Sequence, residues 1–133
     1  MLKSDAGRDG FDWLLRWFDW WRQPDRRTRV LDSRPTIAPG TTLDVHYVLE
    51  ESTFKGRTFR LTNSEWYFNT QLETDGWVVA LLDAFAAHQS VAEVYAAAKQ
   101  TGRVPEGFDE ADFVDLVGFL VERGLIAGVP AGA

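Results

Sequence analysis

The chain contains no cysteine, and histidine occurs only at His46 and His88. The absence of cysteine excludes disulfide bonds, thiolate metal ligands and cysteine nucleophiles, and it makes the cytoplasm the expected compartment. Neither histidine has ligand-type neighbours at the spacing of a metal site. We therefore expect no metal and no cofactor.

Long hydrophobic runs and an excess of positive charge are also lacking. No stretch approaches the roughly 18 consecutive apolar residues of a membrane-spanning helix, and residues 1–10 lack the apolar core of a secretory signal. The 14 Lys and Arg residues are outnumbered by 20 Asp and Glu residues, which gives a net charge of -6. Because phosphate neutralisation needs clustered Lys and Arg, neither a nucleic acid nor a membrane is an expected partner.

Catalytic patterns are equally scarce. The carboxylate pairs Glu50/Glu51 and Asp109/Asp112 are better explained by solvation and helix capping than by acid–base catalysis, which also requires a pocket and a partner. The sequence has no glycine-rich phosphate loop and no activated-serine motif. We predict that the protein is not an enzyme.

Tryptophan is abundant near the start of the chain. Residues 11–22, FDWLLRWFDWWR, hold four of the six tryptophans and predict an amphipathic helix that ends before Pro24. One side of this helix carries Trp13, Trp17, Trp20 and Trp21, and the other carries Phe11, Leu14, Leu15 and Phe18.

We expect the Leu/Phe side to pack on the domain and the tryptophan side to dock on a partner enzyme, because tryptophan is favoured in interface anchors. The alternatives are that the whole helix covers the sheet or self-associates. A membrane-surface role is disfavoured, since the polar stripe has two Asp against one Arg.

Residues 22–40 are rich in arginine and proline. This composition predicts an irregular, solvated linker, with a docking strap for an acidic partner as the alternative. Residues 1–40 are accordingly expected to lie outside the main domain.

Period-two alternation predicts three strands between residues 41 and 72. Residues 41–51 form the first, and its expected inward side chains are Leu43, Val45, Tyr47 and Leu49. A turn at 54–56 leads to a second strand over 57–62, and a tight turn at Asn63-Ser64 leads to a third over 65–72. The third strand is expected to point Trp66, Phe68 and Leu72 inward and Tyr67, Asn69 and Gln71 outward. The short links imply an antiparallel meander.

Three helices are predicted after the strands, because each has a start signal. Thr74 caps a helix over 75–87, and Ser90 with Glu93 forms a capping box for a helix that runs to about residue 99. Asp109, with Asp112 at the third helical position, caps a helix that ends at Arg123-Gly124. Leu125 and Ile126 are expected to pack on the core, and residues 128–133 to form a frayed tail.

The segments LETDGWVVALLDAFAAHQSVAEVYAAA (72–98) and DFVDLVGFLVERGLI (112–126) resemble the PqqD-like family, which includes the recognition elements of pathways that modify ribosomally made peptides. The family's Ser/Thr-Val-x-Glu-Ile/Val helix start is matched at 90–94, and its closing Gly-Leu-Ile/Leu at 124–126. The family's frequent Asp-Gly turn is replaced by Ala87-His88-Gln89. The resemblance implies a winged-helix-like α+β fold over 41–127, with a three-stranded antiparallel sheet before a three-helix bundle and the N-terminal amphipathic helix as an addition.

The resemblance also implies a binding site. In the family, a precursor's leader peptide adds to the third strand and lies against the third helix. Carried onto this sequence, the strand residues that bind the peptide are Trp66, Tyr67, Phe68, Asn69, Thr70 and Gln71.

The third helix supports this site from its own pattern. Asp112, Asp115 and Glu122 cluster opposite its core side, and Phe119 projects among them. An aromatic ringed by carboxylates suits a peptide with an apolar anchor beside basic residues. The alternative is that Phe119 lies under the linker or the N-terminal helix, and that the acids only solvate the surface.

These observations predict a non-catalytic module that binds a leader peptide and presents it to a modifying enzyme. The enzyme could be a radical enzyme, a cyclodehydratase, a peptide ligase or a non-haem iron oxygenase, and a heterodimer with it is one expected assembly. Two alternatives stay open. One is a winged-helix DNA-binding regulator, disfavoured by six acids and no Lys or Arg from Glu106 to Glu122. The other is a small subunit that only stabilises an enzyme complex.

Overall fold

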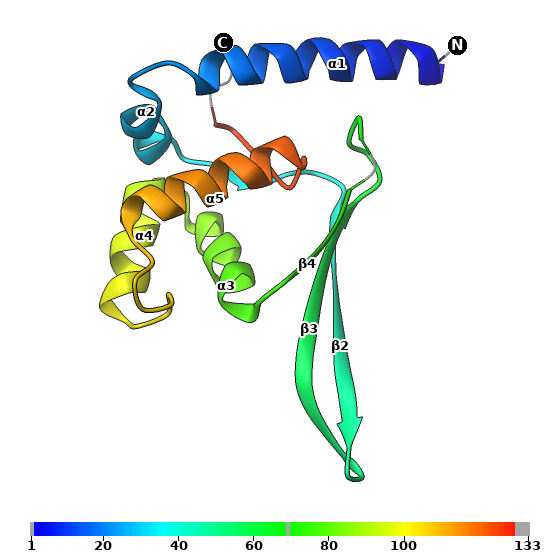
Figure 1. The fold of residues 1–133 in the computed structure, drawn as a ribbon, viewed down its shortest axis with the longest axis vertical. Coiled ribbons are helices and arrows are strands. Elements are labelled where there is room, and N and C mark those ends of the chain that lie inside the picture. Colours follow the sequence, from blue (N-terminus) through cyan, green and yellow to red (C-terminus); the bar gives the residue numbers. More distant parts are fainter. Residues whose placement is uncertain (1, 69, 130–133) are drawn as a thin grey trace.

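The computed structural model describes residues 2–68 and 70–129, with side chains described from residue 9 onward except at positions 55 and 56. The fold is mixed α+β with antiparallel sheets (Figure 1). Its helices are α1 Leu2–Trp21, α2 Arg26–Asp32, α3 Gly76–Ala84, the short 3-10 helix η1 Phe85–Ala87, α4 Val91–Gln100 and α5 Glu110–Glu122. Its strands are β1 Thr36–Ile37, β2 Thr41–Glu50, β3 Thr53–Asn63, β4 Thr70–Thr74 and β5 Ile126–Ala127.

The predicted starts of two helices are confirmed. Ser90 and Glu93 form a reciprocal capping box at α4, and Asp109 and Asp112 form another at α5. The first helix begins one residue later than expected, with Asp75 rather than Thr74 at the cap position. The expected core side of α5 is also confirmed, because Phe113, Val117 and Leu120 are buried. Local cap chemistry therefore fixed where these helices begin.

The strands β2 and β3 form a hairpin that projects far beyond the helices (Figure 1). At its base Leu43 pairs with the buried Leu61, but Leu43 itself is 42% exposed. Val45, Tyr47 and Leu49 are exposed as well. The expectation that they are buried is wrong, because the strands continue past the end of the helices that would cover them.

The turn of this hairpin lies at Glu51-Ser52, and the predicted turn at 54–56 is wrong. Glu51 and Ser52 both have positive φ, 50° and 69°, as in the two-residue turns that match the twist of paired strands. Gly56 is instead the extra residue of a bulge, since Tyr47 pairs with Arg57 while Val48 pairs with Lys55. Glycine inside a strand is typical of such a bulge.

The basic segment after α1 is ordered, and the linker prediction is wrong. Helix α2 buries Val30, and β1 pairs antiparallel with β5. A single hydrophobic core contains Trp17, Val30 and Val129 together with the helices of the middle region. Residues 1–40 therefore do not form a separate unit. Val129 is buried rather than frayed, while residues 130–133 lie outside the described residues.

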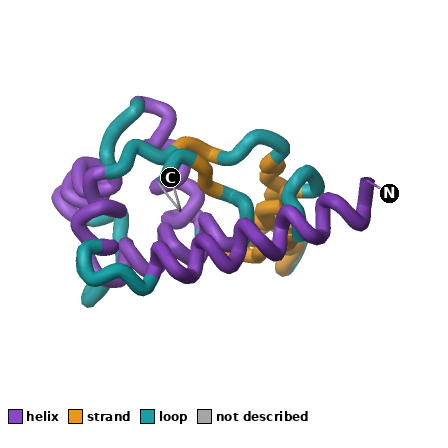
Figure 2. The backbone as a smooth tube through the Cα atoms, turned by 90° about the horizontal axis from the view of Figure 1, so that it is seen from above, coloured by secondary structure: helices purple, strands orange, loops and turns teal. Residues whose placement is uncertain are grey.

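The long helix α1 lies across one end of the molecule, over the sheet at one end and over the other helices at its far end (Figure 2). It begins well before the predicted start at Phe11 and ends at Trp21, close to the predicted end. Within the described part of the chain, no helix is long and apolar enough to cross a membrane.

Candidate functional site

Strand β4 is one free edge of the three-stranded sheet, whose order is β2-β3-β4. It pairs with residues 59–63 of β3, and within the described residues it has no other strand neighbour. An edge strand offers a row of unpaired N–H and C=O groups. Gln71 and Glu73 are exposed along it, and Glu73 accepts a hydrogen bond from Arg60 at 3.0 Å.

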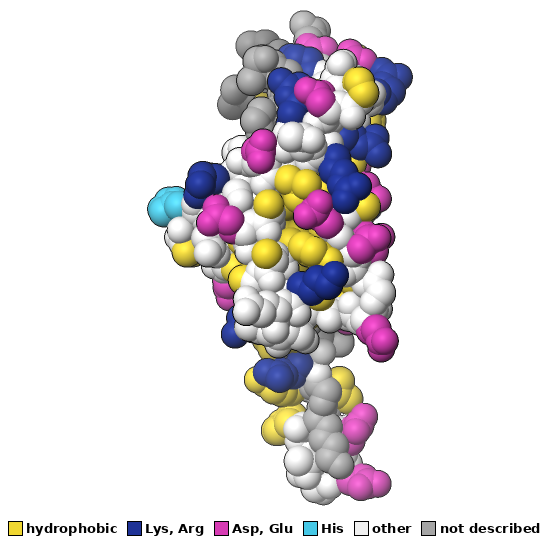
Figure 3. All heavy atoms as spheres, turned by 90° about the vertical axis from the view of Figure 1, so that its left-hand side faces the viewer, with side chains coloured by type: hydrophobic (Ala, Val, Ile, Leu, Met, Phe, Trp, Pro, Cys, Tyr) yellow, Lys and Arg dark blue, Asp and Glu magenta, His cyan; other side chains and the backbone are white. Residues whose placement is uncertain are grey.

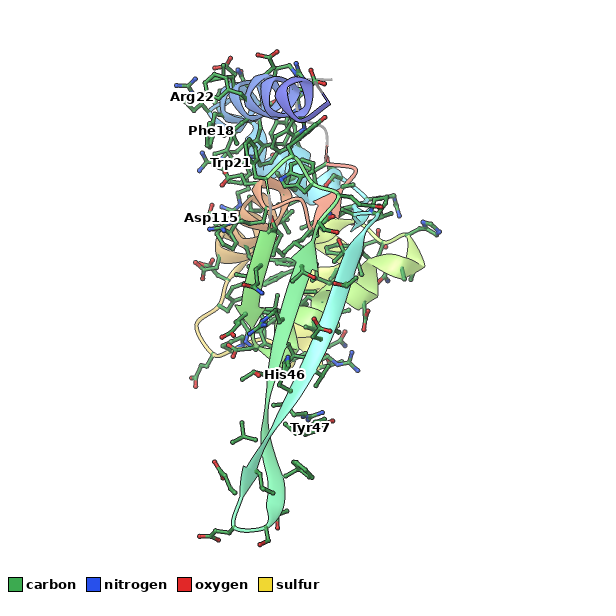
Figure 4. All side chains as sticks on the ribbon, turned by 90° about the vertical axis from the view of Figure 1, so that its right-hand side faces the viewer. Phe18, Trp21, Arg22, His46, Tyr47 and Asp115 are labelled. Atoms are coloured by element: carbon green, nitrogen blue, oxygen red, sulfur yellow. The ribbon has the colours of Figure 1, made fainter. Side chains whose placement is uncertain are left out.

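Helix α5 presents a polar stripe on the same side of the molecule as β4, as Asp115 shows in Figure 4. Asp112, Asp115 and Phe119 are exposed on successive turns of this helix. The Arg123 guanidinium lies 4.9 Å from the centre of the Phe119 ring, as in a cation–π contact. The Phe119 side chain is thus 37% exposed, and the Arg123 side chain covers part of its ring.

Glu122, the fourth predicted residue of this stripe, lies elsewhere. It is half-buried and accepts a hydrogen bond from Trp17 Nε1 at 3.0 Å. Its carboxylate is therefore engaged in holding α1 to α5 and is not free to bind a peptide in this conformation.

Two side chains from the sheet hold the end of α5 beside the start of β4. Thr70 Oγ1 donates to the Arg123 carbonyl at 2.6 Å, and Asn63 Nδ2 donates to the Gly124 carbonyl at 2.7 Å. The last carbonyls of a helix have no intrahelical donor, so these bonds satisfy groups that would otherwise be unpaired. Neither role is predictable from the sequence, because the partners lie 53 and 61 residues away and no local spacing signals them.

Gly124 completes this junction. Its φ is +72°, and a side chain there would begin 2.2 Å from the ring of Trp66. Glycine is therefore required twice, for the left-handed backbone that ends the helix and for the close approach of the indole.

The predicted third strand over 65–72 is wrong in position. Residues 64–68 form a bent segment, and the strand begins only at Thr70. Trp66 lies edge-on to Trp13, with ring centres 4.8 Å apart, and Tyr67 lies against Gly10. Asn69 lies outside the described residues. Of the six predicted strand residues, the exposed Gln71 and the buried Thr70 are on β4, while Trp66, Tyr67 and Phe68 pack near α1 or precede the strand.

The tryptophans of α1 face this chain's own core, which reverses the expected orientation of the helix. Trp17 is fully buried and Trp20 nearly so, while Trp13 and Trp21 are half-buried against the same core. Of the side that was expected to pack, Phe11, Leu15 and Phe18 are exposed, and only Leu14 is half-buried against the core. The four tryptophans therefore offer no open docking surface in this structure.

One residue of α5 explains why α1 lies as it does. Gly118 is buried, and a side chain on it would begin 2.4 Å from the ring of Trp21. The small residue leaves a notch in α5 that the indole fills. A glycine inside a helix is otherwise unfavourable by about 1 kcal/mol relative to alanine, so its presence follows from this contact.

Two carboxyl groups at helix starts have lowered pKa values. The backbone N–H of Asp112 lowers the pKa of Asp109, and the backbone N–H of Ser90, together with its hydroxyl and Arg34, lowers the pKa of Glu93. Hydrogen bonds to the charged form explain both directions. No cluster of His, Asp and Glu suited to a metal ion occurs among the described residues.

A family model described as "Domain of unknown function (DUF7782)" matches residues 12–128. The chain belongs to the DUF7782 family. The match runs from the first tryptophan turn of α1 to the end of β5, so the family's domain joins the N-terminal helix and the sheet-and-helix region in one unit, as the shared core does. The description of DUF7782 carries no activity, and the comparison with curated proteins gave no match.

Proposed function

We propose that this protein binds an extended peptide along β4, beside α5, and presents it to a modifying enzyme without catalysing a step itself. The peptide would be the leader of a ribosomally made precursor, as the resemblance to the PqqD-like family implies. On this proposal β2, β3 and β4 are the sheet of a winged-helix-like domain, and α3, α4 and α5 are its helices.

The observation that carries the proposal is the free edge of β4 beside an exposed stripe on α5. The bonds from Thr70 and Asn63 fix the end of α5 next to the start of β4. Asp112 and Asp115 place negative charge on the stripe, and Phe119 places an aromatic ring there. This combination supports main-chain pairing along the strand with side-chain selection by the helix.

The peptide would add to the sheet over the five residues Thr70–Thr74. Asp115 would attract a basic side chain of the leader, and Phe119 would receive an apolar one after Arg123 moves from its ring. Holding the leader raises the effective concentration of the rest of the precursor at the enzyme. The proposed compartment is the cytoplasm, where ribosomal peptides are made.

The test uses a synthetic leader taken from a short precursor reading frame encoded beside the gene. Amide hydrogen exchange of the full chain is measured with and without this peptide. We expect slower exchange at alternate residues of Thr70–Thr74, because only alternate N–H groups of an edge strand point away from β3. Equal exchange rates in both samples would overturn the proposal.

A charge reversal separates the helix stripe from the rest of the acidic surface. Asp115→Lys is expected to weaken leader binding about tenfold, since a favourable contact becomes repulsive. Asp83→Lys makes the same change on an exposed residue of α3 and should leave affinity within about twofold. If the protein is instead a DNA-binding regulator or a purely stabilising subunit, neither the unchanged chain nor either variant should bind the leader.

A further inference from the structure

The outer edge of β2 is the second free edge of the sheet, and it lacks the features that keep edge strands apart. The strand is ten residues long, with residues 42–50 all exposed, and within the described residues it pairs only with β3. It contains no Pro, Lys or Arg. The bulge lies on β3, so β2 itself is uninterrupted. Natural edges are commonly short, broken or lined with charges, lysine above all, to prevent association; this one is long and unbroken, and its only acidic residues are Asp44 and Glu50.

We propose that β2 pairs antiparallel with β2 of a second copy of this chain, which joins two sheets across a two-fold axis. Figure 1 shows that the outer edge of the hairpin is clear of the helices, so a second hairpin can approach it. Figure 3 shows hydrophobic side chains gathered on the projecting part. Leu49 and Phe54 there are 61% and 69% exposed, and burial against a second copy would remove part of this surface from water.

The side chains select one register. A two-fold axis perpendicular to the sheet places one residue of β2 opposite the same residue of the second copy. The two side chains of each cross-strand pair then lie on the same face of the joined sheet. With Val45 at the axis, Leu43 lies opposite Tyr47 of the second copy, and Asp44 lies opposite His46 of the second copy. A carboxylate can accept a hydrogen bond from an imidazole N–H in either charge state of the ring. The apolar pair lies on one face of the joined sheet and the polar pair on the other, so both faces are complementary.

Neighbouring registers are worse. An axis at Asp44 opposes two carboxylates, and an axis at Tyr47 opposes Asp44 to Glu50. An axis at His46 opposes Asp44 to Val48. Like charges directly opposite one another are destabilising, so charge disfavours the Asp44 and Tyr47 registers. An axis at Val48 opposes His46 to Glu50 but overlaps only residues 46–50 of each strand, whereas the Val45 register overlaps residues 41–49.

The Asp44–His46 pair would extend a row of charges that already crosses the sheet. Asp44 lies opposite Arg60 on β3, and Arg60 lies opposite Glu73 on β4. The Arg60 guanidinium and the Glu73 carboxylate are 3.0 Å apart. The row alternates in sign from strand to strand. His46 of the second copy would place a hydrogen-bond donor beyond Asp44.

The same register brings an exposed leucine to a hollow. Leu49 would lie opposite Thr41 of the second copy, on the face of the sheet that turns toward α3. A cavity of about 100 Å³ opens there, at the base of β2. The residues that line it are Ile37, Thr41, Thr42, Leu43, Leu61, Val79, Leu82 and Asp83. Its apolar members make it a suitable site for Leu49, and the two-fold axis makes the contact twice.

The dimer would leave β4 free at both outer ends of the joined sheet. Dimerisation through β2 is therefore independent of peptide binding at β4, and an experiment can refute one of the two proposals without the other.

Disulfide trapping tests the register directly, because the chain has no cysteine of its own. In the full chain, Val45→Cys places two thiols opposite each other, and opposed residues of antiparallel strands are roughly 4.5–5.5 Å apart between Cα atoms, within disulfide range. Mild oxidation is expected to give a covalent dimer on a non-reducing gel. Ser52→Cys, at the exposed turn and away from the axis, should remain monomeric. Equal yields from the two variants, or none from Val45→Cys, would overturn the proposal.

Sedimentation over a concentration series tests the charge pair without a crosslink. The 15.1 kDa chain is expected to reach twice its mass. His46→Glu should weaken the dimer about tenfold, because two attractive pairs become repulsive, whereas His46→Lys keeps a donor toward Asp44 and should not weaken it. Gln71→Glu adds the same charge at the other edge and should have no effect. A chain that stays monomeric throughout, or equal dimer affinities of His46→Glu and His46→Lys, would refute the interface.

Discussion

Trp17 Nε1 donates a hydrogen bond to the Glu122 carboxylate at 3.0 Å, although 105 positions separate the two residues. Trp17 is fully buried, so its N–H has no water to replace this partner. Gly118, one turn earlier on α5, receives Trp21 from the same helix. These contacts make α1 part of the core and leave its Phe11, Leu15 and Phe18 side exposed.

Replacing Trp17 should destabilise the whole domain. Trp17→Phe keeps an aromatic ring but removes the donor to Glu122 and leaves a small void, so we expect a loss of about 2 kcal/mol in the free energy of unfolding. Urea unfolding followed by tryptophan fluorescence measures it. Phe18→Leu, on the adjacent exposed position, should change stability by less than about 0.5 kcal/mol. Equal effects of the two variants would contradict the observed orientation of α1.

Gly118 should tolerate no side chain while Trp21 is present. Gly118→Ala is expected to destabilise the protein by about 1–3 kcal/mol, even though alanine is the better helix former. Combining it with Trp21→Ala should remove most of this penalty, because the clashing ring is gone. The coupling free energy of the double-mutant cycle, from thermal or urea unfolding, decides the matter. Strictly additive effects would show that the two residues do not touch.

The junction between β4 and α5 should depend on Asn63. This side chain is 2% exposed and donates to the Gly124 and Pro39 carbonyls, at 2.7 and 3.3 Å, while accepting from the Glu65 N–H at 2.9 Å. Asn63→Ala leaves these groups unpaired and is expected to lower stability by about 2–3 kcal/mol.

Thr70→Val provides a graded comparison, because it removes one hydroxyl, which donates to the Arg123 carbonyl at 2.6 Å and lies 3.2 Å from the Phe68 carbonyl, while keeping the shape of the side chain. Its loss should be smaller, about 1 kcal/mol. Thermal melts of both variants measure the difference. A larger effect of Thr70→Val would contradict the central role given to Asn63.

The cap of α4 predicts a dependence of stability on pH. The Ser90 backbone N–H, then its hydroxyl and Arg34, lower the pKa of Glu93 in the folded chain. The unfolded chain therefore binds a proton at this site more readily, and the stabilising contribution is present above the ordinary glutamate pKa and lost as the pH falls through the lowered value.

Glu93→Gln should accordingly flatten the acid side of the stability curve, measured by urea unfolding at several pH values. Glu106→Gln, on an exposed loop residue, serves as the matched control and should leave the curve unchanged. Titration of the Glu93 carboxyl by NMR gives a second readout. A pKa of Glu93 at or above its ordinary value would refute the cap assignment.

The parts of the fold that were predictable depend on neighbours in sequence. The capping boxes at Ser90 and Asp109 involve residues three apart, so their spacing alone identified the helix starts. The buried side of α5 followed from helical periodicity in the same way. For the candidate site, the exposed Asp112, Asp115 and Phe119 were identified from that periodicity, while the position of the edge strand was not.

The errors concern contacts between distant segments. Alternation placed Val45, Tyr47 and Leu49 on one side of a strand, but it carries no information on where the covering helices end. The bent segment before β4 holds Trp66 because Gly124 and Trp13 receive its ring, and these lie 58 residues after it and 53 before it in the chain.

By itself, the sequence determined the helix caps, the turn-forming glycine after α5, the two sides of α1 and the acidic character of the surface, because each depends on local spacing or on composition. Only the tertiary structure decided which side of α1 is buried, where the edge strand begins and that the hairpin extends into solvent. The physical reason is that both sides of α1 are apolar, so burial was settled by shape: the notch at Gly118 and the carboxylate of Glu122 accept tryptophan, and they offer the phenylalanine side no equivalent contact.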